Sequence, residues 1–336
     1  MQADAVWFLA RDMDIVYQVF RAHYKDIQSS YVHVSRAAMM QLNIRYYPQE
    51  FFQYYFHAYM LNGTLKISQI LSEVNLKVLK KYLHEEGLNE DQIFNADTYE
   101  AMRRVYLAHI DAVCKSFSNA VEGAKAYFRS LAGECKRICV VDLGWNGTIM
   151  VELSRFFKHH GLDDIALEYV LLGAANTQTA NDLQISGKLH TYVFSGLHDK
   201  DLQLDVTTLE GNTKIMCLEA LFSADAPTLA SYGLNADGQP CFKFGAKTEK
   251  SWQIEDIQHG ILDFVAKYMR VTRKLAVDPI IFPRDAFAPY LSIASDFAYQ
   301  YLLFSQVLEN EDGMAVTGNQ KRLTTLGQIM EKRGLL

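Results

Sequence analysis

Short, continuous apolar runs alternate with helical patterns at the start of this chain, and this alternation constrains the fold more than any other feature. Ala5–Leu9 is apolar throughout and ends in Ala10-Arg11-Asp12. Apolar residues then recur with helical spacing from Ile15 to Phe20, and a second short run covers Tyr31–Val34. A fully apolar run indicates a strand buried on both faces, which is typical of parallel sheets. The order strand–helix–strand therefore predicts an α/β fold with a mostly parallel, Rossmann-like sheet.

The same pattern returns in the middle of the chain. Ile138–Val141 is the clearest strand in the sequence, and a helical pattern from Thr148 to His160 follows it. Further strands are predicted at 167–172 and 191–194. Between about 48 and 130 the pattern is helical instead, which predicts a large helical insertion in the α/β core.

The inserted segment is unusually aromatic near its start. This crowding has two interpretations: a stacking surface for a base or a sugar, or a helix packed on all sides, and the packing interpretation is favoured. The aromatic residues are Phe51, Phe52, Tyr54, Tyr55, Phe56 and Tyr59. The stretch from Asp97 to Phe128 then predicts one long helix or two.

The last part of the chain predicts a hairpin and several helices. Residues 228–244 form a hairpin pattern around the turn sequence at 235–238, Asn-Ala-Asp-Gly. Helical patterns cover 216–222, 255–271, 284–307 and 321–332. We expect a catalytic core at 1–200, with the insertion at about 48–130, and a C-terminal helical and hairpin lobe at 201–336 packed on that core.

Composition excludes several classes of protein. Of the 336 residues, 49% are hydrophobic and 21% are charged, so a sizeable core is expected. The net charge of −6 and the lack of a basic stripe argue against nucleic acid as a partner. No apolar run approaches the length of a membrane span, and the start of the chain lacks a secretion signal. Five cysteines without a Cys-x-x-Cys pair predict free thiols in a reducing cytoplasm.

The loop after the clearest strand carries the strongest site signal. Asp142 follows the buried strand, Gly144 and Gly147 lie in a short loop, and a helix begins at Thr148. Ligands of open α/β sheets bind at this carboxyl edge, where glycines allow close approach and helix amides favour phosphate. Thr148 is expected to cap the helix or to bind a phosphate oxygen, and Asp142 to hold sugar hydroxyls or a metal-bound water. The loop matches neither a Walker A motif nor a dinucleotide fingerprint.

Two arginines follow the first two strands. Arg11 comes directly after the first strand, and Ser35-Arg36 follows the second strand in a similar position. If the strands are parallel, both guanidinium groups lie at the same sheet edge as Asp142. Arginine binds phosphate and pyrophosphate through paired hydrogen bonds. The sequence thus predicts a ligand with phosphates at both ends.

Four segments together resemble a known family. Phe8–Asp12, Tyr31–Arg36, Val140–Thr148 and Leu218–Ala224 occur in the same order in bacterial surface-polysaccharide proteins. From Trp7 to about Tyr232 the chain resembles the divergent type I phosphoribosyltransferase module of bacterial ribofuranosyltransferases. That module often follows a phosphatase module of the haloacid-dehalogenase type.

The resemblance implies transfer of ribose 5-phosphate from phosphoribosyl pyrophosphate to a glycan acceptor, either free or lipid-linked, in O-antigen or capsule synthesis. It implies Mg²⁺, held through the pyrophosphate or by Asp142, and a phosphatase module or partner. The expected location is the cytoplasm, including the inner face of the membrane when the acceptor is lipid-linked. The expected catalytic residues are Asp142, Arg11 and the general-base candidate Glu219, which lies in the fourth segment. The expected substrate-binding residues are Asp12, Ser35, Arg36, Gly144, Trp145, Asn146, Gly147 and Thr148.

Two other interpretations stay open at this point. Asp12-Met13-Asp14 follows a strand and is similar to the nucleophile and acid of haloacid-dehalogenase-like phosphatases. In that case Asp12 would attack phosphorus and Asp14 would protonate the leaving group. The third interpretation is a non-catalytic scaffold that has kept the fold.

Overall fold

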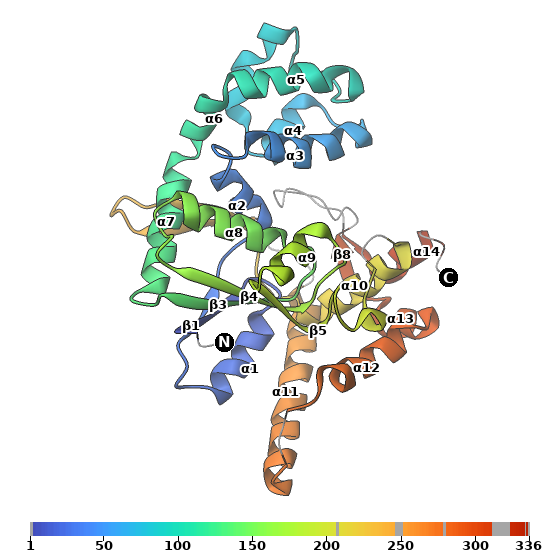
Figure 1. Cartoon of the computed structure of the whole chain (residues 1–336). Helices are drawn as coiled ribbons and strands as arrows, with labels where there is room; N and C mark the ends of the chain where they lie inside the picture. Colours follow the sequence, from blue (N-terminus) through green and yellow to red (C-terminus); the bar gives the residue numbers. More distant parts are fainter. Residues whose placement is uncertain are drawn as a thin grey trace.

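The computed structural model describes residues 3–205, 208–245, 251–277, 280–310, 323–332 and 334. At its centre lies a five-stranded sheet in which every neighbouring pair is parallel. The strand order is β2-β1-β3-β4-β5, and Figure 1 shows helices above and below this sheet. The strands are β1 (Ala5–Leu9), β2 (Ser29–Val32), β3 (Arg137–Asp142), β4 (Ala166–Gly173) and β5 (Leu189–Phe194). The predicted α/β fold class with a parallel sheet is confirmed.

The sheet is buried on both faces because successive strand residues point to opposite sides. Trp7 and Val140 belong to one core cluster, and Phe8 and Val141 belong to another. The first face packs against helices α2 (Arg36–Leu42), α7 (Ser118–Ala132), α8 (Thr148–His159) and α9 (Gln178–Ile185). The second face packs against α1 (Asp14–His23) and α10 (Leu209–Phe222). This double layer explains why the strands are apolar at almost every position.

The helical insertion has a core of its own. It comprises α3 (Pro48–Asn62), α4 (Ile67–Glu73), the 3-10 helix η1 (Lys77–Glu86), α5 (Ala96–Ala108) and α6 (Ile110–Ser116). In Figure 1 these helices lie together above the sheet and its covering helices. Four members of the aromatic run are buried in this second core, which confirms the packing interpretation for them: Phe51, Phe52, Tyr55 and Phe56. Tyr54 points elsewhere and is 42% exposed.

The stretch from Asp97 to Phe128 differs from the expected one or two helices. It forms parts of three, because the chain bends at His109 and at Phe117. The last of the three, α7, packs its apolar side against the sheet rather than inside the insertion. The core of the insertion therefore ends near Phe117 instead of near residue 130.

The predicted hairpin is present as an antiparallel pair, β6 (Leu229–Leu234) and β7 (Pro240–Phe244). It packs on α7 so closely that a Cβ atom at Gly123 would lie 2.3 Å from the carbonyl oxygen of Gly233. Tyr232 of the hairpin is buried in the core of the sheet. The hairpin, although late in the sequence, thus covers the helix layer of the sheet.

The remaining C-terminal elements differ in part from the sequence expectation. They are η2 (Lys200–Leu202), α11 (Ser251–Leu275), α12 (Pro283–Ala294), α13 (Phe297–Phe304), β8 (Leu308–Asn310), β9 (Leu323–Thr325) and α14 (Leu326–Lys332). The single helix expected over 284–307 is wrong, because Asp296 caps a new helix by accepting a hydrogen bond from the Ala298 amide. Residues 323–325, expected to be helical, pair with β8 as a strand; residues 321 and 322 lie outside the described ranges.

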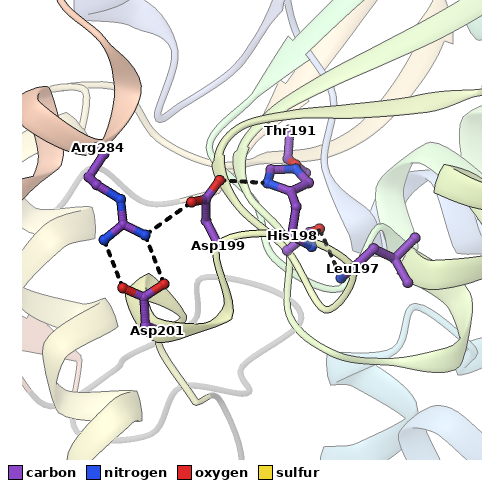
Figure 2. Close-up of polar contacts among 7 residues, drawn as sticks. Thr191, Leu197, His198, Asp199, Asp201 and Arg284 are labelled. Carbon is purple, nitrogen blue, oxygen red and sulfur yellow. Dashed lines mark hydrogen bonds and ion pairs between the residues drawn. The ribbon is translucent and has the colours of Figure 1, made fainter.

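Residues on both sides of position 200 share cores. Phe8 and Phe194 lie in the same apolar cluster as Leu218 and Phe287. An arginine adds a polar connection: Arg284 of α12 binds both Asp199 and Asp201, which follow β5 (Figure 2). None of the helices in the described ranges is both long and apolar enough to cross a membrane.

Candidate active site

The strand order places a topological switch point between β1 and β3. From β1 the chain runs to β2 on one side of the sheet, and it later returns to β3 on the other side of β1. The loops that leave these two neighbouring strands therefore diverge, and ligands of open α/β sheets bind in such positions. The register pairs Phe8 with Val141, so the two strands end at the same level. The structure thus brings the loops at 10–13 and 143–147 to one edge.

The loop after β3 has the backbone that its glycines were expected to allow. A Cβ atom at Gly144 would lie 2.5 Å from the carbonyl oxygen of Gly173, so a larger residue does not fit. Gly147 has a φ of 73° and is the N-cap of α8. Both cis peptide bonds of the described chain, Ala10–Arg11 and Gly144–Trp145, lie in these two edge loops.

The capping role expected for Thr148 is wrong, because Gly147 occupies the N-cap and Thr148 is the first helical residue. Among the described residues, no side chain caps this end of α8. The first amides of a helix have no partner within the helix, and they carry its positive dipole end. The start of α8 is therefore suited to bind an anion, and the Thr148 hydroxyl lies beside it.

Asp142 is the most perturbed acid at this edge. The pKa of its carboxyl is raised to about 8, chiefly by burial and also by the nearby carboxylates of Asp12 and Glu219. The Leu143 amide, which donates a hydrogen bond to Asp142 Oδ1 at 2.9 Å, and the charge of Arg36 oppose this rise. The side chain keeps some contact with solvent, but protein atoms surround the carboxyl closely enough for desolvation to dominate. Four chain segments therefore meet electrostatically at Asp142.

Glu219 is joined to the edge loop by a direct hydrogen bond. The Trp145 indole Nε1–H donates to Glu219 Oε1 at 2.9 Å. The indole ring is buried and stacks on Phe194, with ring centroids 6.0 Å apart and planes 6° apart. Trp145 therefore holds the side chain of Glu219, a residue of α10, in place. The indole ring itself leaves little surface free for a ligand.

Arg36 begins α2 and reaches toward the helical insertion. Its Nη1–H donates to the Tyr54 hydroxyl oxygen at 2.9 Å. Burial pulls the pKa of Arg36 down, but the influence of Tyr54, Tyr55 and Glu219 outweighs it and leaves the pKa raised. Tyr54 is a site-adjacent residue that sequence reasoning did not single out. The available signal was weak, because Tyr54 stands in a run of aromatic residues that are mostly buried.

The remaining expected site residues have different surroundings. Arg11 is half-buried in the loop after β1, and its carbonyl accepts a long hydrogen bond of 3.4 Å from the Tyr31 hydroxyl. Asn146 is exposed in the glycine loop. Ser35 is buried and caps α2: its Oγ accepts from the Ala38 amide at 3.1 Å and donates to the Leu229 carbonyl at 2.7 Å. The Ser35 hydroxyl thus ties α2 to the hairpin.

The aspartates of the phosphatase-like motif have separate environments. Asp12 influences Asp142, as described above. Asp14 is the first residue of α1, and its Oδ2 accepts hydrogen bonds from Gln18 at 2.9 Å and from Gln258 of α11 at 3.5 Å. Only Asp12 of this pair is thus tied electrostatically to the edge carboxyl.

A divalent cation would suit the paired carboxylates of Asp12 and Asp142. Their mutual repulsion raises the pKa of Asp142, and a cation between them would remove that repulsion. Within the described ranges, no group of three or more His, Cys, Asp or Glu side chains is arranged to hold a metal ion. Mg²⁺ commonly takes only one or two carboxylates and completes its shell with substrate phosphates and water. The two acids therefore fit Mg²⁺ that arrives with a phosphorylated ligand.

Comparison with known proteins adds no identification. No protein-family model matches the chain, and a search of curated proteins finds no significant match.

Proposed function

We propose that this protein is a glycosyltransferase that moves ribose 5-phosphate from phosphoribosyl pyrophosphate to a hydroxyl group of a glycan acceptor. The acceptor would be a bacterial surface polysaccharide of the O-antigen or capsule type. One observation carries the proposal: an acid with a pKa of about 8 lies at the switch point, with Asp12, Arg36 and Glu219 around it. Perturbed acids of this kind cluster at functional sites.

The two ends of the donor have matching groups at the edge. The 5-phosphate would bind the loop from Gly144 to Thr148, where the uncapped amides of α8 favour an anion. The pyrophosphate would bind Arg11 and Arg36, whose guanidinium groups come from the two loops on the other side of the switch point. When bound, Mg²⁺ would be held by Asp12 and Asp142 together with the pyrophosphate, and it would neutralise charge on the leaving group.

The reaction is a displacement at the anomeric carbon. The acceptor oxygen forms a bond to C1 while the bond from C1 to the pyrophosphate oxygen breaks, and pyrophosphate leaves with the electron pair. Positive charge develops on the ribose ring, and the Asp142 carboxylate would stabilise it. The hydroxyl proton would pass to Glu219, which the Trp145 hydrogen bond holds in position.

The protonation state of Asp142 would depend on whether a cation is bound nearby. With a pKa of about 8, the carboxyl is mainly protonated at neutral pH in the empty protein. A nearby cation lowers the pKa of a carboxyl and favours its ionised form. Binding of the donor with Mg²⁺ would therefore convert Asp142 to the carboxylate that the displacement needs. A phosphatase on another module or chain would then remove the 5-phosphate from the product.

A haloacid-dehalogenase-like phosphatase is the second candidate, because Asp12 follows β1 and lies near Asp142 as a metal-binding pair would. The contacts of Asp14 argue against it. Two amide side chains donate to the Asp14 carboxylate, whereas the proposed acid of a phosphatase needs to carry a proton and face the leaving group. A non-catalytic scaffold is the third candidate, and it predicts no specific ligand.

Thermal unfolding with two ligands separates these three candidates. Phosphoribosyl pyrophosphate with Mg²⁺ should raise the melting temperature by several degrees at saturating concentration, because it binds only the folded state. A phosphomonoester with Mg²⁺ should have little effect. A larger shift with the phosphomonoester would favour the phosphatase, and no shift with either ligand would favour the scaffold.

A further inference from the structure

The outer half of α11 exposes an apolar stripe. Phe264, Tyr268, Val271 and Leu275 recur at helical spacing and therefore lie along one side of the helix. Phe264 is 67% exposed and Leu275 is 65% exposed, and the Phe264 and Tyr268 rings stack on each other. The inner half of α11 differs, because Ile254 and Gln258 are buried and Gln258 donates to the Ser223 carbonyl. The helix is thus fixed at one end and exposes apolar side chains at the other.

The segment that follows α11 also exposes apolar side chains, and it returns to the body of the molecule, where the Ile281 carbonyl accepts a hydrogen bond from the Tyr192 hydroxyl of β5 at 3.1 Å. Ile280 is 77% exposed and Phe282 is 79% exposed, among the highest exposures of large hydrophobic side chains in the described chain. In Figure 1 the far end of α11 extends well beyond the body of the molecule. We name the residues 264–277 the α11 tip. The tip is a protrusion rather than a groove. Its shape suits insertion into a fluid apolar layer better than the enclosure of a small ligand.

The charge of the α11 tip is opposite to that of the whole chain. By helical spacing Lys274 flanks the apolar stripe, Arg270 lies about a third of a turn away and Arg273 lies on the opposite side. Residues 264–277 include no acid. Lys267 also lies there, but it forms an ion pair with Asp263 at 2.5 Å. The protein as a whole has a net charge of −6. Asp278, which follows, is outside the described ranges.

We propose that the α11 tip binds the surface of an anionic lipid bilayer. Exposed aromatic and aliphatic side chains flanked by Lys and Arg are the pattern of helices that lie in the membrane interface. The apolar residues would enter the boundary of the acyl chains, while the long basic side chains reach back to the lipid phosphates. This proposal does not depend on the proposed transferase activity.

Charge argues against a second copy of the chain as the occupant. Two copies packed along the stripe would bring the basic residues that flank it, above all Lys274, close to their counterparts, and like charges in contact are destabilising. An anionic bilayer supplies the opposite charge, and its fluid interior accepts protruding side chains without a matching groove. The observations therefore favour lipid over self-association.

Vesicle co-sedimentation tests the proposal with the full chain. Vesicles of phosphatidylcholine with roughly one third phosphatidylglycerol should pull down the protein, and pure phosphatidylcholine vesicles should not. The triple variant Arg270→Ser, Arg273→Ser, Lys274→Ser should lower the partition coefficient about a hundredfold, since each basic residue near such a surface contributes about tenfold or somewhat less. The double variant Phe264→Ser, Leu275→Ser should lower it at least about tenfold.

Matched controls use exposed residues far from the tip in sequence. Lys77→Ser, Lys115→Ser and Lys158→Ser together remove the same charge, and Leu61→Ser with Ile185→Ser removes comparable exposed apolar surface. Both control variants should bind like the wild type, and all variants should keep the wild-type circular dichroism spectrum. Equal binding to both vesicle types, or no loss in the tip variants, would overturn the proposal. Self-association that the Phe264 and Leu275 double variant abolishes, without vesicle binding, would replace it with a dimer interface.

Discussion

Two clusters in this molecule each contain acids and an arginine, but the surroundings of the acids shift their pKa values in opposite directions. In the surface cluster of Figure 2, Arg284 donates to Asp201 Oδ2 at 2.7 Å and to Asp199 Oδ1 at 3.1 Å. The hydrogen bonds from His198 and Arg284 lower the pKa of Asp199, and the hydrogen bonds from Arg284 lower that of Asp201. His198 bridges Asp199 and Thr191 on the other side. Donors and acceptors are matched in this cluster, and its evident role is to join α12 to the end of β5.

In the edge cluster the carboxyls act on one another, while Glu219 accepts a hydrogen bond from the Trp145 indole and Asp142 accepts one from the Leu143 amide. Arg36 donates to Tyr54, and the pKa of Asp142 is raised to about 8, chiefly by burial and also by the carboxyls of Asp12 and Glu219. A protein that used this edge only for stability would gain from an apolar residue in place of Asp142. The contrast teaches that a cluster of matched ion pairs supports structure. An acid at a switch point whose pKa is raised by burial and by neighbouring carboxyls is the better candidate for chemistry.

The sharpest way to break this comparison is to neutralise one acid in each cluster. Asp142→Asn should reduce transferase turnover by at least roughly a hundredfold, because it removes the charge that faces the developing cation. Asp199→Asn should leave turnover within about twofold, since its cluster lies outside the proposed site. The measurement is the rate at which pyrophosphate is released from phosphoribosyl pyrophosphate, and circular dichroism confirms that each variant is folded. Near-normal turnover of folded Asp142→Asn would remove Asp142 from the reaction.

The next prediction compares arginines. Arg11→Ala should weaken pyrophosphate binding by about tenfold or more, because charge-assisted hydrogen bonds contribute about 1.5–3 kcal/mol each. Arg11→Lys should be impaired less but still measurably, since a point charge does not reproduce a paired donor. Arg284→Ala should bind pyrophosphate like the wild type. Titration calorimetry in Mg²⁺ would decide; equal affinity in wild type and Arg11→Ala would place Arg11 outside the site.

The core of the fold was predictable because it depends on local patterns. The apolar runs at 5–9 and 138–141 are buried on both faces by parallel neighbours, and this environment leaves few alternatives to such sequences. The break before Phe297 and the strand at 323–325 were not predictable. They depend on a helix cap at Asp296 and on pairing with β8, and tertiary contacts of this kind override helical periodicity.

The candidate site was predictable only in part. Residues that directly follow strands, such as Arg11 and Asp142, could be placed from the sequence because parallel strands end at one edge. The contacts from distant elements could not. Tyr54 reaches Arg36 from the helical insertion, and Glu219 reaches Trp145 from a helix 74 positions later. Glu219 was singled out through a family resemblance, and nothing in its local pattern indicated this contact.

The pH dependence of stability should differ between the two clusters. The pKa of Asp142 is raised from 3.8 to about 8, so the folded state loses stability relative to the unfolded state as pH rises between these values. Asp142→Asn avoids this loss and should melt about 2–4 °C above the wild type beyond about pH 8, with a smaller advantage near pH 5. Calorimetric scans across this range would show it, and a constant difference would contradict the raised pKa.

Asp199 should behave in the opposite way. Its pKa is lowered, so its contribution to stability is complete above the ordinary value of 3.8 and is lost as pH falls through the folded-state pKa. Asp199→Asn should therefore melt below the wild type, and the difference in melting temperature should be about the same at pH 5 as at pH 8 in the same calorimetric scans. A melting advantage for Asp199→Asn that grows with pH would mean that the two clusters do not differ as described.

The smallest expected effect concerns Asp14 and separates transferase from phosphatase. Asp14 lies in the first turn of α1, where its charge complements the helix dipole and contributes about 0.3–1 kcal/mol. Asp14→Asn keeps an oxygen that can accept from Gln18 and Gln258, so turnover and stability should change little. A phosphatase would instead lose its acid, and its aspartyl-phosphate on Asp12 would be mimicked by a metal fluoride complex. Loss of activity in Asp14→Asn, together with fluoride bound at Asp12, would replace the transferase proposal with the phosphatase.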